Sequence, residues 1–183
     1  MFRAQVKIVT PKFATSQDYA LCTTLASNLV AATFDSLQPD KRLVVLDVGM
    51  AMAATVDFFS QFKSKLLFVD LYSEAFVAEI SEDVSHEYLV AQFQKALDIP
   101  DNCIIDVCLF WDFFNYLDGT LIRAFIEALQ PYVAEHTRGF GLGALNSRCQ
   151  LPNSCYGLMA EDKLTQCPRS DEQRPVYPHS QRD

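Results

Sequence analysis

The sequence predicts a single α/β domain of the doubly wound kind, with a mostly parallel Rossmann-like sheet flanked by helices and a hairpin near the C-terminus. Three continuous apolar runs favour this fold, because strands buried on both faces of a parallel sheet lack polar alternation. Segments with helical periodicity separate the runs, as in right-handed parallel crossovers. The runs are Lys41 to Gly49, Lys65 to Leu71 and Cys103 to Phe110.

The N-terminal part predicts one strand and one helix. Gln5 to Val9 alternates polar and apolar residues, which is typical of a short strand. Thr15 and Asp18 then fit a capping box, with Asp in place of the usual Glu. Three leucines at helical spacing predict that this helix runs to about Leu37 and buries them on one face. They are Leu21, Leu25 and Leu29.

Three more helices are expected from apolar periodicity. Ala51 to Phe62 lies between the first two buried strands, and Ser85 to Leu97 precedes the third. The last helix spans Gly119 to about Val133, with Asp118 as its N-cap. The side chains expected on buried helix faces include Tyr88 and Ile126.

The C-terminal part predicts short strands and a tail. Gly139 to Leu145 is a glycine-rich strand, and Tyr156 to Thr165 fits a hairpin with its turn near Glu161 and Asp162. From Gln166 the sequence is polar, contains three prolines and lacks apolar periodicity, which is typical of an extended or disordered tail. We therefore expect one domain over residues 1–165 and a tail over residues 166–183.

Composition and charge narrow the possible partners. The 183 residues fit one domain of ordinary size, and 23 acidic against 15 basic residues give a net charge of −8. Lys and Arg are scattered, so no basic patch predicts nucleic-acid binding. The longest apolar stretch, Leu43 to Val56, contains Asp47 and is shorter than the roughly 20 residues of a membrane span. We expect a cytoplasmic protein without membrane contact.

The six cysteines are interpreted as free thiols that serve as small apolar side chains. No two of them are spaced as Cys-x-x-Cys, and a cytoplasmic protein is not expected to hold disulfides. A zinc site built from Cys149, Cys155, Cys167 and His179 would match no common ligand spacing, so we expect no metal. The cysteines are Cys22, Cys103, Cys108, Cys149, Cys155 and Cys167.

A ligand crevice is expected where the parallel strands end. In open α/β sheets ligands bind at the carboxyl ends of the strands, which places the turn after Gly49, Asp70 and the pair Trp111–Asp112 around one site. A glycine lets the backbone approach a ligand closely. A carboxylate after the second strand can accept hydrogen bonds from ribose hydroxyls, and an aromatic ring can stack on adenine or line the pocket.

These same segments resemble the Rossmann-type S-adenosylmethionine-dependent methyltransferase family. The resemblance covers about residues 40 to 145 and rests on VVLDVG (44–49), FVDL (68–71) and IIDVCLFWDFFNYL (104–117). It implies S-adenosylmethionine as the cofactor and methyl transfer to a small-molecule or protein acceptor. The implied cofactor-binding residues are Asp47, Gly49, Met50, Ala51, Asp70, Leu71 and Trp111. Asp112 is the implied catalytic residue, which would orient the acceptor.

The sequence departs from the family pattern at two places. The family loop is usually Asp/Glu-x-Gly-x-Gly-x-Gly, whereas Ala51 and Ala53 stand at two of its glycine positions. If either alanine had to adopt a left-handed conformation, it would cost about 1–2 kcal/mol. The chain between Leu71 and Ile104 is also short for a helix, a strand and a helix, so the family's third strand is expected to be reduced or absent.

Two functional hypotheses follow from this pattern. The first is a methyltransferase, and the second is a methyltransferase-like interaction or scaffold protein without catalysis, working with a protein partner or as a homodimer. The loop after Gly49 distinguishes them. An open loop with free backbone amides favours cofactor binding, whereas a crevice filled by Met50 or Met52 favours the second hypothesis.

A third hypothesis is a dinucleotide-binding protein. Gly49, Ala51 and Ala54 fit the spacing G-x-G-x-x-G/A, and Asp70 follows at about 20 residues, as in nicotinamide-dinucleotide sites. Asp47 argues against this hypothesis, because dinucleotide motifs seldom place an acid two residues before the first glycine.

Overall fold

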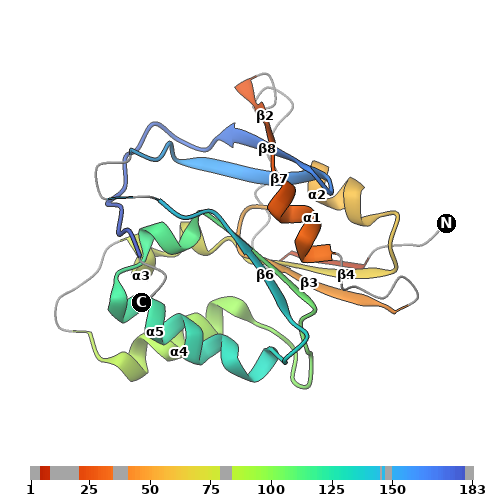
Figure 1. The fold of residues 1–183 in the computed structure, drawn as a ribbon. Helices are drawn as coiled ribbons and strands as arrows, with labels where there is room; N and C mark the ends of the chain where they lie inside the picture. Colours follow the sequence, from red (N-terminus) through yellow and green to blue (C-terminus); the bar gives the residue numbers. More distant parts are fainter. Residues whose placement is uncertain are drawn as a thin grey trace.

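The computed structural model describes residues 5–8, 21–34, 41–78, 84–144, 146 and 150–179, arranged around a central sheet (Figure 1). Five strands form this sheet in the order β1-β4-β3-β5-β6, and every neighbouring pair is parallel. The predicted α/β fold with a mostly parallel sheet is therefore confirmed. The strands are β1 (Gln5–Ile8), β3 (Leu43–Asp47), β4 (Ser64–Phe68), β5 (Val107–Trp111) and β6 (Arg138–Gly141).

Both faces of the sheet are covered, which explains the continuous apolar runs. On β3, Leu46 packs into the apolar cluster of α4 and α5, while Val45 packs into the cluster of α1 and α2 on the other face (Figure 1). Within the described residues, no helix has the length and apolar character needed to cross a membrane. The helices are α1 (Asn28–Phe34), α2 (Ala53–Phe59), α3 (Ala75–Ala78), α4 (His86–Leu97) and α5 (Gly119–Leu129), with 3₁₀ turns η2 (Leu71–Ser73), η3 (Phe113–Tyr116) and η4 (Gln130–Tyr132).

The N-terminal strand occupies the outer place beside β4. Its register pairs Gln5 with Lys65 and Ile8 with Phe68. The described residues between Leu71 and Ile104 form η2, α3 and α4 but no strand, which agrees with the expected loss of the family's third strand.

The predicted N-terminal helix is wrong over its described first part. Residues Thr23–Ala26 form strand β2, and only Asn28–Phe34 is helical. Leucines spaced by four residues fit the period of two of a strand as well as the period of a helix, so their spacing did not decide between them. Thr15 and Asp18 lie outside the described residues. The three leucines expected to be buried are instead exposed: Leu21 (72%), Leu25 (36%) and Leu29 (71%).

The helix α5 begins where its predicted cap places it. Asp118 Oδ1 accepts hydrogen bonds from the backbone N–H groups of Thr120 and Leu121, at 2.9 and 2.8 Å, so its predicted role as N-cap is confirmed. The prediction that Tyr88 and Ile126 are buried is wrong, because they lie on the exposed sides of α4 and α5. Periodicity located these helices but did not fix the edges of their buried faces.

The predicted C-terminal hairpin is confirmed and belongs to a second sheet. Strands β7 (Ser154–Ala160) and β8 (Lys163–Pro168) pair antiparallel, and β2 pairs with the other side of β8. The hairpin lies over the same face of the central sheet as α1 and α2 (Figure 1). Beyond β8, residues 169–179 form no helix or strand but are hydrogen-bonded to the domain, for example through Tyr177 N–H to the carbonyl of Asn115 at 2.7 Å.

The expectation that the cysteines are free thiols is wrong for two of them. Cys22 and Cys167 form a disulfide across a sequence separation of 145 residues. The pairing of β2 with β8 brings these positions together, and the sequence shows no local sign of that pairing. Cys103, Cys108 and Cys155 are free thiols.

Candidate functional site

The carboxyl ends of β3, β4 and β5 lie side by side, as the sequence predicts. Asp47, at the end of β3, is in register with Phe68 of β4 and Leu109 of β5. The segments that follow these strands therefore bring Asp70 and Asp112 to the same edge of the sheet. The structure shows what each side chain contacts there.

The carboxylate of Asp47 accepts hydrogen bonds from two nearby groups of the protein. Its Oδ1 accepts hydrogen bonds from Gly49 N–H at 2.9 Å and from Trp111 Nε1–H at 2.7 Å. Its Oδ2 is buried and has no hydrogen-bond partner. Burial, with a smaller contribution from the charge of Asp70, raises the pKa of Asp47 to about 7, although the two hydrogen bonds oppose the shift. This carboxyl group therefore titrates near neutral pH.

Gly49 is required by close packing rather than by a left-handed backbone. Among the described glycines none has a positive φ. A Cβ at Gly49 would lie 3.2 Å from Asp47 Oδ1 and 3.2 Å from Trp111 Cδ1. Ala51 and Ala53 are likewise absent from the described positive-φ residues, so the alanines of this loop carry no left-handed strain.

Trp111 has an unusual backbone conformation. Its φ is 52°, in the left-handed region, which costs a residue other than glycine about 1–2 kcal/mol. Its ring donates to Asp47 and stacks on Tyr156, with ring centroids 5.8 Å apart and planes 14° apart. The backbone strain at Trp111 thus accompanies an indole that is 1% exposed and packed beneath the hairpin.

Met52 occupies the space between the loop after Gly49 and the hairpin. Its side chain is fully buried and packs with Cys155 and Cys167. A Cβ at Gly157 of β7 would lie 3.0 Å from Met52 Cβ, so the hairpin lies directly on the loop. Met50 is partly buried against the same cluster. The loop is therefore packed against the chain's own C-terminal sheet.

Asp70 is bound by an arginine from the segment after β8. Arg169 Nη2 donates to Asp70 Oδ2 at 2.6 Å, and Ser73 Oγ donates to the same oxygen at 2.7 Å. The guanidinium also lies over the ring of Tyr72, 5.3 Å from its centroid. Both charged side chains are largely buried, at 13% exposure for Arg169 and 7% for Asp70. Asp70 Oδ1 is buried without a hydrogen-bond partner.

Three tyrosines occupy both carboxylate oxygens of Asp112. Tyr72 donates to Oδ1 at 2.7 Å, and Tyr116 and Tyr156 each donate to Oδ2 at 3.1 Å. Burial raises the pKa of Asp112, and the tyrosine hydrogen bonds oppose that shift. Burial and the Asp112 charge together raise the pKa of each tyrosine, which keeps the hydroxyls protonated as donors. Asp112 is thus surrounded by donors from its own chain.

The sequence did not single out the groups that complete this cluster. Tyr72, Tyr116 and Tyr156 come from η2, η3 and β7, and Arg169 comes from a segment expected to be an extended or disordered tail. Tyr72, Tyr156 and Arg169 carry no local signal, because each acts through a partner distant in sequence. Tyr116 is only four residues from Asp112, but its spacing does not show that its hydroxyl reaches that carboxylate. Leu71, an implied cofactor contact, is fully buried in the apolar core between β4 and the helices.

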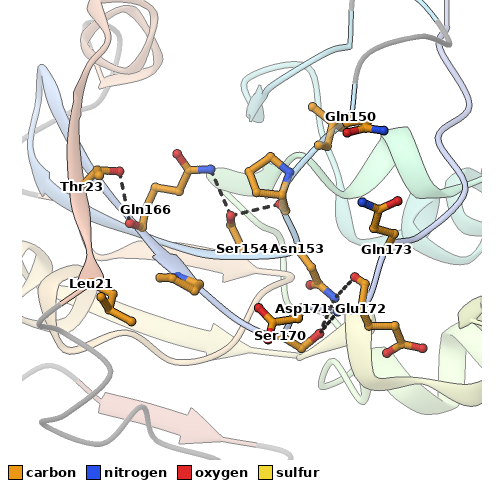
Figure 2. Close-up of a pocket in the computed structure, with 13 residues that line it drawn as sticks. Leu21, Thr23, Gln150, Asn153, Ser154, Gln166, Ser170, Asp171, Glu172 and Gln173 are labelled. Atoms are coloured by element: carbon orange, nitrogen blue, oxygen red, sulfur yellow. Dashed lines mark hydrogen bonds between the residues drawn. The ribbon is translucent and has the colours of Figure 1, made fainter.

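A cleft of about 500 Å³ lies away from these acids (Figure 2). Leu21 and Thr23, at the start of β2, line it together with Gln166 of β8 and residues 150–154 and 170–173. Pro168 and Ser170 also line the cleft, whereas Arg169 between them reaches Asp70. None of the implied cofactor-binding residues lines this cleft.

Among the described residues, no group of three or more His, Cys, Asp or Glu side chains could hold a metal ion. Comparison of the chain with protein-family models, with curated proteins and with solved structures found no match in any of the three.

Proposed function

We propose that this chain is a methyltransferase-like α/β module that does not bind S-adenosylmethionine and serves as an interaction or scaffold protein. The observation that carries the proposal is the ion pair between Arg169 and Asp70. The family resemblance assigns Asp70 to the cofactor ribose. Here the guanidinium of Arg169 donates to Asp70 in place of a ribose hydroxyl.

The rest of the crevice supports the same conclusion. Met52 is fully buried beneath the hairpin, which is the arrangement expected of the non-catalytic hypothesis. Trp111 is held by Asp47 and covered by Tyr156. Both oxygens of Asp112 accept hydrogen bonds from tyrosines, so most of its capacity to accept a substrate proton is already used within the chain. The residues present do not fit the cofactor, and no methyl-transfer step is derived for them.

The free energy of the ion pair between Arg169 and Asp70 also disfavours ligand binding at Asp70. A ligand that displaced Arg169 would break a largely buried ion pair, and breaking such a pair costs about 3–5 kcal/mol. Each 1.4 kcal/mol lowers affinity about tenfold, so this contact alone would weaken binding by roughly two to nearly four orders of magnitude. A cofactor could bind only if other contacts offset that loss.

One observation favours the methyltransferase as a second candidate. Asp47 Oδ2 and Asp70 Oδ1 are both buried without a hydrogen-bond partner. Buried polar atoms without partners are rare in folded proteins and call for an explanation. Both atoms belong to residues that the resemblance assigns to the cofactor, so an open conformation with a bound ligand would satisfy them.

Calorimetric titration of S-adenosylmethionine and S-adenosylhomocysteine separates the two candidates. For the wild type we expect no heat and no thermal stabilisation at millimolar ligand. Micromolar binding that Asp70→Ala abolishes would overturn the proposal and favour the enzyme. Arg169→Ala, compared with the exposed control Arg138→Ala, tests the closure directly, because binding gained only in Arg169→Ala would show that this guanidinium blocks the site. The same titrations with NAD⁺ and NADH test the dinucleotide hypothesis.

A further inference from the structure

Three cysteines from three neighbouring strands form a row in the small sheet. Cys22, at the start of β2, is bonded to Cys167 of β8. Cys155 of β7 is a free thiol and lies directly opposite Cys167 in the antiparallel register. Directly opposed residues of antiparallel strands point to the same face, with Cβ atoms about 4.5–5.5 Å apart. A free thiol therefore lies beside a disulfide.

We propose that these cysteines form a thiol–disulfide exchange site, in which the disulfide moves from Cys22–Cys167 to Cys155–Cys167. The thiolate of Cys155 attacks Sγ of Cys167. The bond between Cys22 and Cys167 breaks as the new bond forms, and Cys22 leaves as a thiolate that takes up the proton released by Cys155. One disulfide and one thiol are present before and after, so the step needs no oxidant or reductant.

The strand geometry suits both bonds. Disulfides usually join residues with Cα atoms 4.4–6.8 Å apart, and opposed residues of antiparallel strands lie about 4.5 or 5.5 Å apart. Cys155 and Cys167 are 4% and 2% exposed, so thiols in solution reach them poorly. Attack from within the sheet has the advantage of a high effective concentration.

The surroundings of Cys155 set the rate of exchange. Burial, with smaller contributions from the charges of Asp70 and Asp112, raises the pKa of the Cys155 thiol to about 11, although the guanidinium of Arg169 opposes the shift. Only a small fraction of Cys155 is therefore thiolate at neutral pH. Since exchange needs the thiolate, we expect it to take minutes to hours and to be faster in alkaline buffer.

Exchange would loosen β2. Among the described strands β2 pairs only with β8, and all four of its residues are exposed. The disulfide holds its beginning, and Ser27 N–H donates to the carbonyl of Asp162 at 2.8 Å just beyond its end. A bond between Cys155 and Cys167 would lie within the hairpin instead. Leu21 and Thr23 line the cleft in Figure 2, so release of β2 would change one wall of that cleft.

Trapping of the released thiol tests the proposal. Oxidised wild-type protein is incubated with iodoacetamide in mildly alkaline buffer, quenched with acid at intervals and mapped by mass spectrometry without reduction. We expect alkylation of Cys22 to grow together with a Cys155–Cys167 peptide. Alkylation of Cys22 should be at least about tenfold faster in the wild type than in Cys155→Ser, which lacks the attacking thiol. Equal rates in the two proteins and no Cys155–Cys167 peptide would overturn the proposal.

A second variant keeps the test independent of Cys155→Ser. In Cys22→Ser, exposure to oxidised glutathione should produce the Cys155–Cys167 disulfide, and amide hydrogen exchange of Thr23–Ala26 should be faster than in oxidised wild type. Thermal unfolding confirms beforehand that the variant is folded. If, in a folded variant, Cys155 and Cys167 take up only glutathione, or stay reduced under conditions in which iodoacetamide labels them, the two sulfurs cannot bond and the proposal is wrong.

Discussion

Arg169 donates to Asp70 at 2.6 Å, although 99 positions separate them in the sequence. The pair joins the segment after β8 to the carboxyl end of β4, and it lies over the ring of Tyr72. A polar segment without secondary structure thereby supplies the cation that pairs with Asp70 at the carboxyl end of β4. The stability of this contact can be measured.

Arg169→Ala should lower the free energy of unfolding by about 3 kcal/mol, because it leaves the Asp70 carboxylate buried without its cation. Adding Asp70→Asn should recover part of that loss, since the uncompensated charge is then removed. Urea unfolding of wild type, both single variants and the double variant gives the coupling energy. Arg138→Ala should change stability by less than about 0.5 kcal/mol. Strictly additive losses would show that the two side chains do not interact.

Asp47→Asn should remove a loss of stability at alkaline pH. The pKa of Asp47 rises from 3.8 to about 7 on folding, so the folded state favours the protonated form. The stability that Asp47 contributes in the wild type should be fully present below about pH 4. It should be lost as the pH rises toward 7, and it should change little above that pH. At pH 9 the variant should exceed wild type by a few kcal/mol, since each pKa unit corresponds to about 1.4 kcal/mol.

Urea unfolding of Asp47→Asn at pH 5, 7 and 9 checks this difference. Asparagine keeps an oxygen that can accept from Gly49 and Trp111, so the hydrogen bonds of Oδ1 are retained. Asp57→Asn, on the exposed side of α2, is the matched control and should follow the wild-type profile. Parallel profiles for wild type and Asp47→Asn would mean that Asp47 is already ionised at low pH.

The tyrosines around Asp112 should contribute unequally. Tyr72→Phe removes the hydroxyl that donates to Oδ1 at 2.7 Å and should cost about 2 kcal/mol, as expected for a hydrogen bond to a charged group. Tyr116→Phe should cost less, because Oδ2 keeps its hydrogen bond from Tyr156. Chemical denaturation compares them with the half-exposed control Tyr88→Phe. Equal effects at Tyr72 and Tyr116 would contradict this division.

Gly157→Ala should destabilise the protein by disturbing the packing of the hairpin on the loop after Gly49. The new methyl would lie 3.0 Å from Met52 Cβ and 3.0 Å from Thr165 Cγ2. These neighbours must move by a few tenths of an ångström to admit the methyl, and such overpacking costs about 1–3 kcal/mol. Gly143→Ala is the control, because its methyl would meet nothing within 4 Å. Thermal unfolding that lowers the midpoint equally in both variants would contradict the close contact.

The amino-acid sequence by itself determined the buried strands of the central sheet and the start of the helix that Asp118 caps. Continuous apolar runs became β3, β4 and β5, because a strand between two layers of helices buries both of its faces. Asp118 was predicted as a helix cap because its acceptor and the first free N–H groups lie within three residues. The edge of the sheet where Asp47, Asp70 and Asp112 meet was also predicted, since parallel strands end together.

Only the tertiary structure decided what those acids contact and how the N-terminal segment folds. The spacing of Leu21, Leu25 and Leu29 is compatible with a helix or a strand. Pairing with β8 selected the strand for Thr23–Ala26, which contains Leu25, whereas Leu29 lies in α1. The disulfide of Cys22, like the ion pair of Asp70 with Arg169, joins residues far apart in the chain. The periodicity of a segment reports its own burial, whereas its partners depend on how distant segments pack.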